Sequence, residues 1–201
     1  MEYLVALTLV AVGAVTLSTR AQRRRIALLG SYLGKYQIEN LMASLTEGYL
    51  RALGEDDPQR RAQVWSVLAT AESVLSEQFK RFVLDFAKVD EADARVSKLP
   101  LALPYASVLF PRATFDLRKA LGLHAHGISS AAENRLNQSQ KDQAYTLCAE
   151  LFLMQHTCHW FCRSRTVASA RLLARHKTSY AQVLAAVSPQ TREAYTRLIG
   201  A

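Results

Sequence analysis

The chain has 201 residues, of which 50% are hydrophobic and 21% are charged, and its formal net charge is +8. This composition excludes a disordered chain, because enough apolar side chains are present to form a core. Eight glycines and five prolines are few for this length, and their scarcity favours helices over a turn-rich sheet protein. The three cysteines, crowded between residues 148 and 162, exclude a typical secreted disulfide scaffold and indicate reduced thiols.

The first element along the chain is an uncharged apolar run over residues 3–19. A helix of this length rises about 25 Å, close to the lower limit for crossing a hydrocarbon core of about 30 Å. Glu2 precedes the run, and a basic cluster follows it: Arg20, Arg23, Arg24 and Arg25. The pattern predicts a single-pass signal-anchor with its basic flank over residues 1–25. A buried core helix and a cleaved signal peptide are the alternatives, but a signal peptide carries its positive charge ahead of the apolar run.

The basic flank also predicts the orientation, because positive residues stay on the cytoplasmic side of a membrane. We therefore expect the N-terminus outside and residues 26–201 inside, as an all-helical cytoplasmic domain. The expected fold class is all-α, with one N-terminal transmembrane helix followed by a bundle of about six or seven helices.

Apolar side chains at helical spacing predict the next two helices. One runs from residue 26 to residue 53, with a soft point near Gly30 or Gly34, and the other from residue 58 to about residue 86. Asp57 is the expected cap of the second helix and Pro58 its first residue. The two helices should form an antiparallel hairpin. A short helix is expected over residues 90–98.

Residues 99–111 form an uncharged segment with three prolines, which exclude a regular helix or a central strand. We expect this segment to be buried in the core, with the membrane interface as the alternative. Short helices are then expected over residues 112–121 and, after a break near Gly122, to about residue 134. No segment has strand periodicity.

The most apolar helix outside the anchor is expected over residues 139–162, and such a helix belongs at the centre of a bundle. Apolar side chains surround nearly the whole helix, and the exception is a polar strip at Glu150, Thr157 and Ser164. Two last helices are expected over residues 165–176 and 189–199.

The sharpest cluster of chemically reactive side chains is Cys158, His159 and Cys162, which helical spacing brings to one side of that apolar helix. Histidine and thiolate are good ligands for zinc, copper or iron. However, the sequence has no paired Cys-x-x-Cys knuckle and no c-type haem motif, and free cysteine commonly packs as a small hydrophobe. We therefore favour packing with no cofactor, and keep these three residues as the candidate metal site.

Basic residues dominate the C-terminal region from residue 163 onwards. The candidates for contact with an anionic partner are Arg163, Arg165, Arg171, Arg175 and Lys177. We favour a solvated or internally paired face for this region, and the main alternative is contact with an anionic lipid or an acidic protein. Nucleic acid is disfavoured, because no clean basic stripe with interleaved aromatic residues is present. Separately, Gly30 and Gly34 form a GxxxG pair that would suit a close helix–helix contact, either within the domain or in a homodimer.

The sequence contains no P-loop, GxGxxG, HExxH, GxSxG or kinase motif, and we assign no catalytic residue. The pattern favours a non-catalytic accessory protein (an adaptor, assembly factor or scaffold) that holds an unidentified protein partner at the cytoplasmic membrane surface. The alternatives are a metal- or haem-binding protein that uses the residues from His156 to Cys162, and a membrane-tethered nucleic-acid binder that uses the basic C-terminal region.

Overall fold

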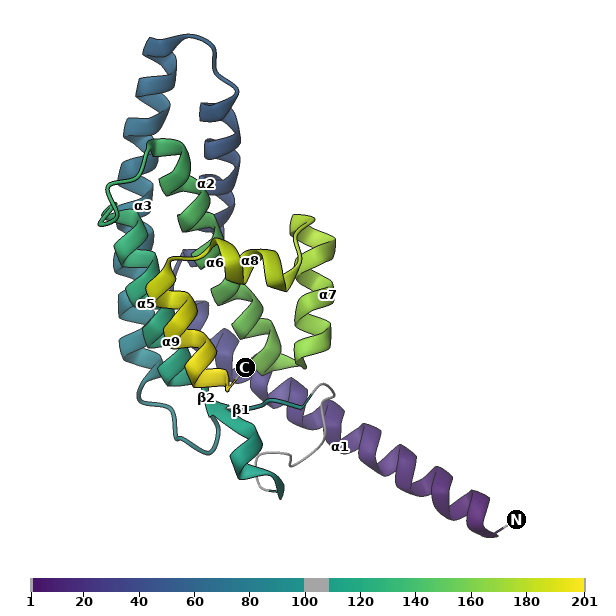
Figure 1. Cartoon of the computed structure of the whole chain (residues 1–201). Helices are drawn as coiled ribbons and strands as arrows, with labels where there is room; N and C mark the ends of the chain where they lie inside the picture. Colours follow the sequence, from purple (N-terminus) through teal and green to yellow (C-terminus); the bar gives the residue numbers. More distant parts are fainter. Residues whose placement is uncertain (1, 100–108, 201) are drawn as a thin grey trace.

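A computed structural model describes residues 2–99 and 109–200, with the backbone only at residues 2, 4, 6, 10 and 11. The described part of the chain contains eight α-helices, one 3-10 turn and one two-stranded antiparallel sheet. The expected all-α class is confirmed, and seven of these helices follow the first. Several of them contact one central helix, α6 (Gln140–Cys162), while the first helix projects to one side as a long arm (Figure 1).

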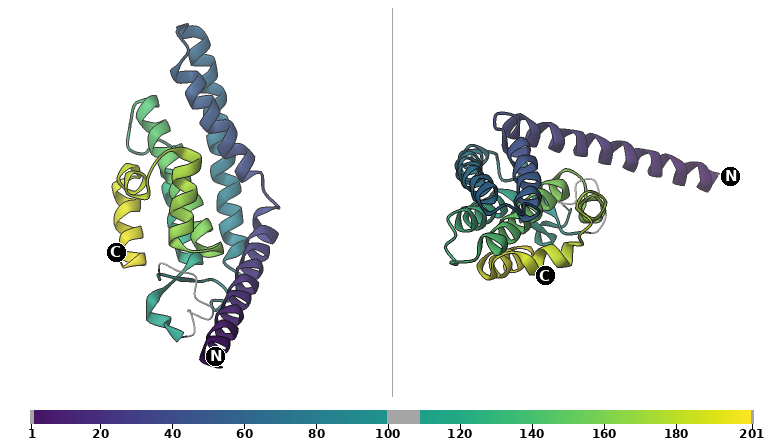
Figure 2. Two further views of the ribbon diagram at one scale, coloured as in Figure 1. Left: turned by 90° about the vertical axis from the view of Figure 1, so that its right-hand side faces the viewer. Right: turned by 90° about the horizontal axis from the view of Figure 1, so that it is seen from above.

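The arm is helix α1 (Glu2–Leu33), which continues without interruption past the basic cluster. Its C-terminal part lies against α3 (Pro58–Phe86) and α6, where Leu29 is buried and Leu28 and Tyr32 pack against the core. Its N-terminal part extends away from the other helices in each view (Figure 2). Within the portion of the chain that the structure describes, no helix combines the length and hydropathy of a membrane span. The transmembrane part of the expected fold is therefore not confirmed.

Helices α2 (Ile38–Leu53) and α3 (Pro58–Phe86) form the expected antiparallel hairpin, which extends beyond the other helices (Figure 1). Asp57 caps α3 by accepting a hydrogen bond from the Gln59 N–H at 2.9 Å, as predicted. The single helix predicted over residues 26–53 is wrong, because α1 ends at Leu33 and the chain turns before α2. The break begins at Gly34, one of the two positions predicted as a soft point, where the N–H still donates to the Gly30 carbonyl oxygen at 2.9 Å.

The helix predicted over residues 90–98 is wrong as well. Here a turn leads into strand β1 (Arg95–Ser97), which pairs antiparallel with β2 (Thr114–Asp116) so that Val96 lies opposite Phe115. The 3-10 turn η1 (Pro111–Ala113) directly precedes β2. Most of the proline-containing segment lies outside the described residues. Leu109 and Phe110, at its described end, are exposed rather than buried.

Helix α5 (Leu117–Ala132) runs through Gly122, where a break was predicted. Gly122 is exposed, so the only penalty it brings to the helix is the weak helix propensity of glycine. Tertiary packing of α5 overcomes this penalty. Asp116 caps this helix by accepting from the Arg118 N–H at 2.9 Å. The buried face of α5, which includes Leu117, Leu121 and Ile128, packs on α3 and α6.

Helix α6 (Gln140–Cys162) lies at the centre, in contact with α1, α2, α5, α7, α8 and β1. This confirms the position predicted from its apolar circumference. Ser139 caps its first turn. Helices α7 (Arg165–His176) and α9 (Pro189–Ile199) have the predicted bounds. Helix α8 (Tyr180–Ala186) was not predicted, because seven residues are too few to display a helical period.

Candidate functional site

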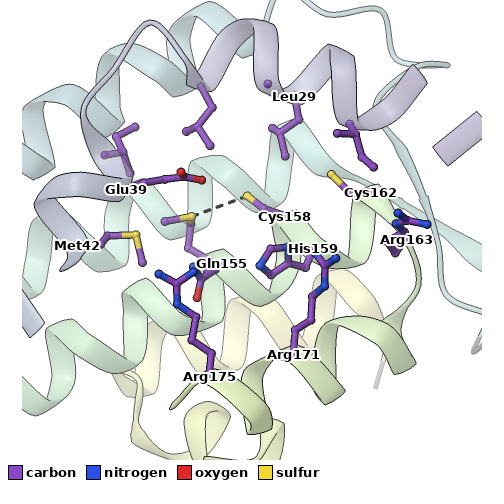
Figure 3. Close-up of a pocket in the computed structure, with 15 residues that line it drawn as sticks. Leu29, Glu39, Met42, Gln155, Cys158, His159, Cys162, Arg163, Arg171 and Arg175 are labelled. Carbon is purple, nitrogen blue, oxygen red and sulfur yellow. Dashed lines mark hydrogen bonds between the residues drawn. The ribbon is translucent and has the colours of Figure 1, made fainter. Parts of the chain in front are cut away.

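A cavity of about 350 Å³ lies between α1, α2, α6 and α7 (Figure 3). Its apolar lining comes from α1, α2 and the middle of α6: Ile26, Leu29, Leu33, Ile38, Met42 and Met154. We call this cavity the α1–α7 pocket.

Two thiols complete the apolar part of the pocket. Cys158 is buried and its thiol lies 3.8 Å from the sulfur of Met154, while Cys162 is half-buried one turn further along α6. Burial raises the pKa of Cys158 far above its ordinary value and that of Cys162 to about 11. Both thiols are therefore neutral at physiological pH, so they line the pocket as small apolar groups.

The opposite side of the pocket carries three arginines: Arg163, Arg171 and Arg175. Arg171 donates to Nδ1 of His159 at 3.3 Å, and Arg163 donates to the side-chain oxygen of Gln22. Burial, followed by the charges of Arg171 and Arg175, lowers the pKa of His159, which keeps the imidazole neutral and able to accept. Among the described residues, none of the three guanidinium groups has a carboxylate within ion-pair distance.

One carboxylate does line the pocket. Glu39, in the first turn of α2, extends its side chain towards Cys158, on the side away from Arg171 (Figure 3). Gln155 lies between Glu39 and the arginines and supplies a neutral polar group. The lining therefore has an excess of positive charge, concentrated at the α7 side.

The predicted metal ligands Cys158, His159 and Cys162 all border this pocket. Over the described part of the chain, however, no group of three or more His, Cys, Asp or Glu side chains could hold a metal ion. The three side chains thus share a pocket without forming a ligand set.

The five basic residues predicted to meet an anionic partner do not all lie together. Arg165 is half-buried, with its guanidinium carbon 5.3 Å from the ring centroid of Trp160 and 5.1 Å from that of Tyr180. Lys177 ends α7 in the left-handed conformation and is exposed. Only the three pocket arginines are brought together, which a charge count along the chain does not reveal.

The GxxxG pair is also placed by the structure. Gly30 borders the α1–α7 pocket, and a Cβ added there would meet no atom within 4 Å. Gly34 lies in the turn beyond α1, where a Cβ would come within 3.0 Å of the Gly30 carbonyl oxygen. No described helix approaches Gly30 closely, so a contact with a second copy of the chain stays a prediction.

The four flanking arginines divide into two pairs. Arg20 and Arg23 are exposed. Arg24 forms an ion pair with Asp93 at 3.0 Å, and Arg25 donates to the carbonyl oxygens of Phe161 at 3.4 Å and Arg95 at 3.3 Å. The second pair therefore fastens the arm to the domain.

Sequence reasoning missed a buried polar network at the junction of α5, α6 and α9. The Thr157 hydroxyl donates to the Leu153 carbonyl oxygen at 2.9 Å, so it accepts from the Tyr195 hydroxyl and from Nε2 of His124, each at 2.9 Å. Beside it, Glu150 accepts from the N–H and the hydroxyl of Ser188. The polar strip on α6 was its only trace in the sequence.

Burial shifts the pKa values of the titratable groups in this network in the direction that favours their neutral forms. Burial lowers the pKa of His124 to about 3 and raises that of Glu150 above its ordinary value. Because Glu150, His124 and Thr157 are fully buried, we assign the network to the stability of the fold.

Comparison of the chain with models of protein families, with curated proteins and with solved structures finds no match.

Proposed function

We propose that this protein is a membrane-anchored accessory protein, in which α1 is embedded in lipid and the other helices form a domain at the cytoplasmic surface. The observation that carries the proposal is the exposure of the α1 arm. The apolar side chains that the structure places on the arm are between 40% and 87% exposed: Tyr3, Val5, Leu7, Leu9, Val12, Val15 and Leu17.

The size of this exposed surface favours an apolar environment. Burial of one Val or Leu side chain contributes about 1.5–3 kcal/mol, so burial of the arm would contribute roughly 10 kcal/mol or more. Soluble monomers rarely expose continuous apolar patches of this extent. Because no other helix that the structure describes covers the N-terminal part of the arm (Figure 1), lipid is the surrounding that fits best.

The polar side chains within the arm support the same proposal. The hydroxyls of Thr16 and Thr19 donate to the carbonyl oxygens of Val12 and Val15, at 2.8 Å and 2.9 Å. Hydroxyls that bond to their own helix need no water, which is the requirement for polar groups inside a bilayer. On the C-terminal side of these threonines, the exposed Arg20 and Arg23 would contact the lipid headgroups of the cytoplasmic leaflet.

The α2–α3 hairpin is where we expect the protein partner to bind. It extends beyond the rest of the domain (Figure 1) and carries exposed apolar side chains near its tip, including Leu50 and Val67. In the proposed orientation, Arg24 and Arg25 fix the arm to the domain, so the hairpin is held at a defined position relative to the membrane. This is the role of an adaptor or scaffold.

The proposal is tested by fractionation of cells that produce the full-length chain, followed by carbonate extraction. We expect the protein in the membrane pellet. The Val12→Asp variant should move to the soluble fraction, because a carboxylate at the centre of a span costs about 2.5–3.5 kcal/mol. Val67→Asp is the matched control, since Val67 is also exposed but lies on the hairpin. Full-length protein in the soluble fraction, or identical behaviour of the two variants, would overturn the proposal.

A further inference from the structure

We propose that the α1–α7 pocket binds an anionic amphiphile, that is, an alkyl chain with a carboxylate or phosphate head such as a fatty acid. The inference concerns a small molecule in the domain and goes beyond the anchoring of α1. It is based on the division of the lining into an apolar part and a cationic part.

The apolar part suits an alkyl chain. Leu29, Ile38 and Met42 are buried, and together with Met154 they surround a volume of about 350 Å³, within the range of pockets that hold small molecules. Methionine side chains adapt readily to flexible ligands. Cys158 and Cys162 face the same space (Figure 3) and, as neutral thiols, add no negative charge.

The cationic part suits the head of such a molecule. Arg171 and Arg175 reach from α7 towards the pocket, and Arg163 lies at its end near Cys162 (Figure 3). Guanidinium groups form paired hydrogen bonds with carboxylate and phosphate. Within the described chain no carboxylate pairs with these three arginines, so an incoming anion does not have to displace one.

Glu39 should affect binding of an anionic amphiphile in the direction opposite to that of the arginines. Its carboxylate lies on the lining opposite the arginines and therefore repels an anionic head. Removal of this charge should strengthen binding, whereas removal of the arginine charges should weaken it. A pocket that recognises only apolar chains would respond to neither change.

The location of the pocket would give it access to lipid, a point that rests on the proposed function. Ile26 is seven residues beyond Thr19, about 10 Å along the helix. If α1 is embedded up to its basic flank, the pocket opens close to the membrane surface, where amphiphiles partition.

The test uses the full-length chain in nanodiscs of neutral phosphatidylcholine and a photoactivatable fatty acid, whose adducts are mapped by peptide mass spectrometry. We expect saturable labelling within residues 26–42 and 154–162. Dodecyl phosphate should displace the probe, whereas dodecanol and inorganic phosphate should not. Nanodiscs that contain phosphatidic acid identify the source of the anionic head. If a bilayer lipid supplies the head, phosphatidic acid should displace the probe. If the ligand is a free amphiphile, phosphatidic acid should leave the labelling unchanged.

Three variants make the test specific. The double substitution Arg171→Gln and Arg175→Gln should weaken binding of the probe about tenfold or more, Glu39→Gln should strengthen it, and Arg192→Gln, which removes a positive charge outside the pocket, should leave it unchanged. Equal displacement by dodecanol, protection by inorganic phosphate alone, labelling that does not saturate, or equal affinity in the double variant would overturn the inference. If the chain does not enter nanodiscs, the same labelling is carried out in solution, so that failure of the anchor is distinguished from failure of the pocket.

Discussion

The guanidinium group of Arg25 lies over the ring of Phe161, with 5.6 Å between its central carbon and the ring centroid, and donates to the carbonyl oxygen of the same residue. This contact joins the arm to the end of the central helix α6. A residue that the sequence presents as part of a membrane flank is thus a structural link. Together with the Arg24–Asp93 ion pair, it holds the arm against the domain.

Replacement of Arg25 by Gln should loosen this link. The side chain would lose its two charge-assisted hydrogen bonds to carbonyl oxygens and its contact with the ring, at a cost of about 1–3 kcal/mol in the free energy of unfolding. Hydrogen exchange of the backbone over residues 20–33 should become faster. Arg23→Gln removes the same charge from an exposed position and is the control. Equal effects of the two substitutions would contradict the structural role of Arg25.

Replacement of the buried Trp160 should lower the free energy of unfolding by more than replacement of Arg25 does. Its side chain is only 2% exposed, and its indole N–H donates to the Ser97 carbonyl oxygen at 2.8 Å. Trp160→Ala should lower the free energy of unfolding by about 3–5 kcal/mol, because it removes buried area and leaves a cavity. Trp160→Phe, which loses the hydrogen bond but keeps an aromatic ring, should cost less. Chemical denaturation measures both, and an unchanged midpoint for Trp160→Ala would show that this side chain is not in the core.

Much of the helical framework could be predicted from the sequence, because local signals encode it. Asp57 and Pro58 mark the start of α3, and the apolar circumference of α6 places it at the centre. Strands β1 and β2 were missed, since each has three residues and its partner is distant in the sequence. The spacing of Cys158 and Cys162 did predict a shared face. The pocket they border could not be predicted, because its lining extends from residue 26 to residue 175 on four helices.

Two glycines of α5 should respond in opposite ways to substitution by alanine. A Cβ at Gly127 would lie 2.3 Å from a carboxylate oxygen of Glu150 and 2.4 Å from the Thr191 hydroxyl, so Gly127→Ala should destabilise the fold by about 1–3 kcal/mol. A Cβ at Gly122 would meet nothing within 4 Å, so Gly122→Ala should stabilise it by up to about 1 kcal/mol through helix propensity. Thermal unfolding of both variants checks the prediction, and the same sign for both would contradict it.

The buried histidines predict a loss of stability in acid. Burial lowers the pKa of His124 to about 3 and that of His156 to about 4, from an ordinary value of 6.5. The unfolded chain therefore binds protons that the folded chain does not. The stability that these groups contribute is present above pH 6.5 and is lost as the pH falls, by about 2 kcal/mol per histidine at pH 5.

Two buried carboxyls act in the opposite direction. The pKa values of Glu72 and Glu150 are raised by burial, so their contribution is present below their ordinary pKa and is lost as the pH rises. Comparison of each histidine variant with the parent chain cancels the contribution of these two carboxyls, because both chains contain them. His124→Gln and His156→Gln should each reduce the difference in unfolding free energy between pH 7 and pH 5 by about 2 kcal/mol. A difference that neither substitution alters would show that the two imidazoles titrate normally in the folded state.

The most direct measurement of the central claim is the accessibility of a cysteine introduced on the arm of the full-length protein in intact membranes. Val12→Cys and Leu50→Cys occupy exposed positions on α1 and α2, and labelling of the native thiols is subtracted with the parent chain. If α1 lies in lipid, a membrane-impermeant maleimide should label Leu50→Cys from the cytoplasmic side and should label Val12→Cys only after denaturation. Equal labelling of the two cysteines in intact membranes would show that the arm is in water, and would contradict the account.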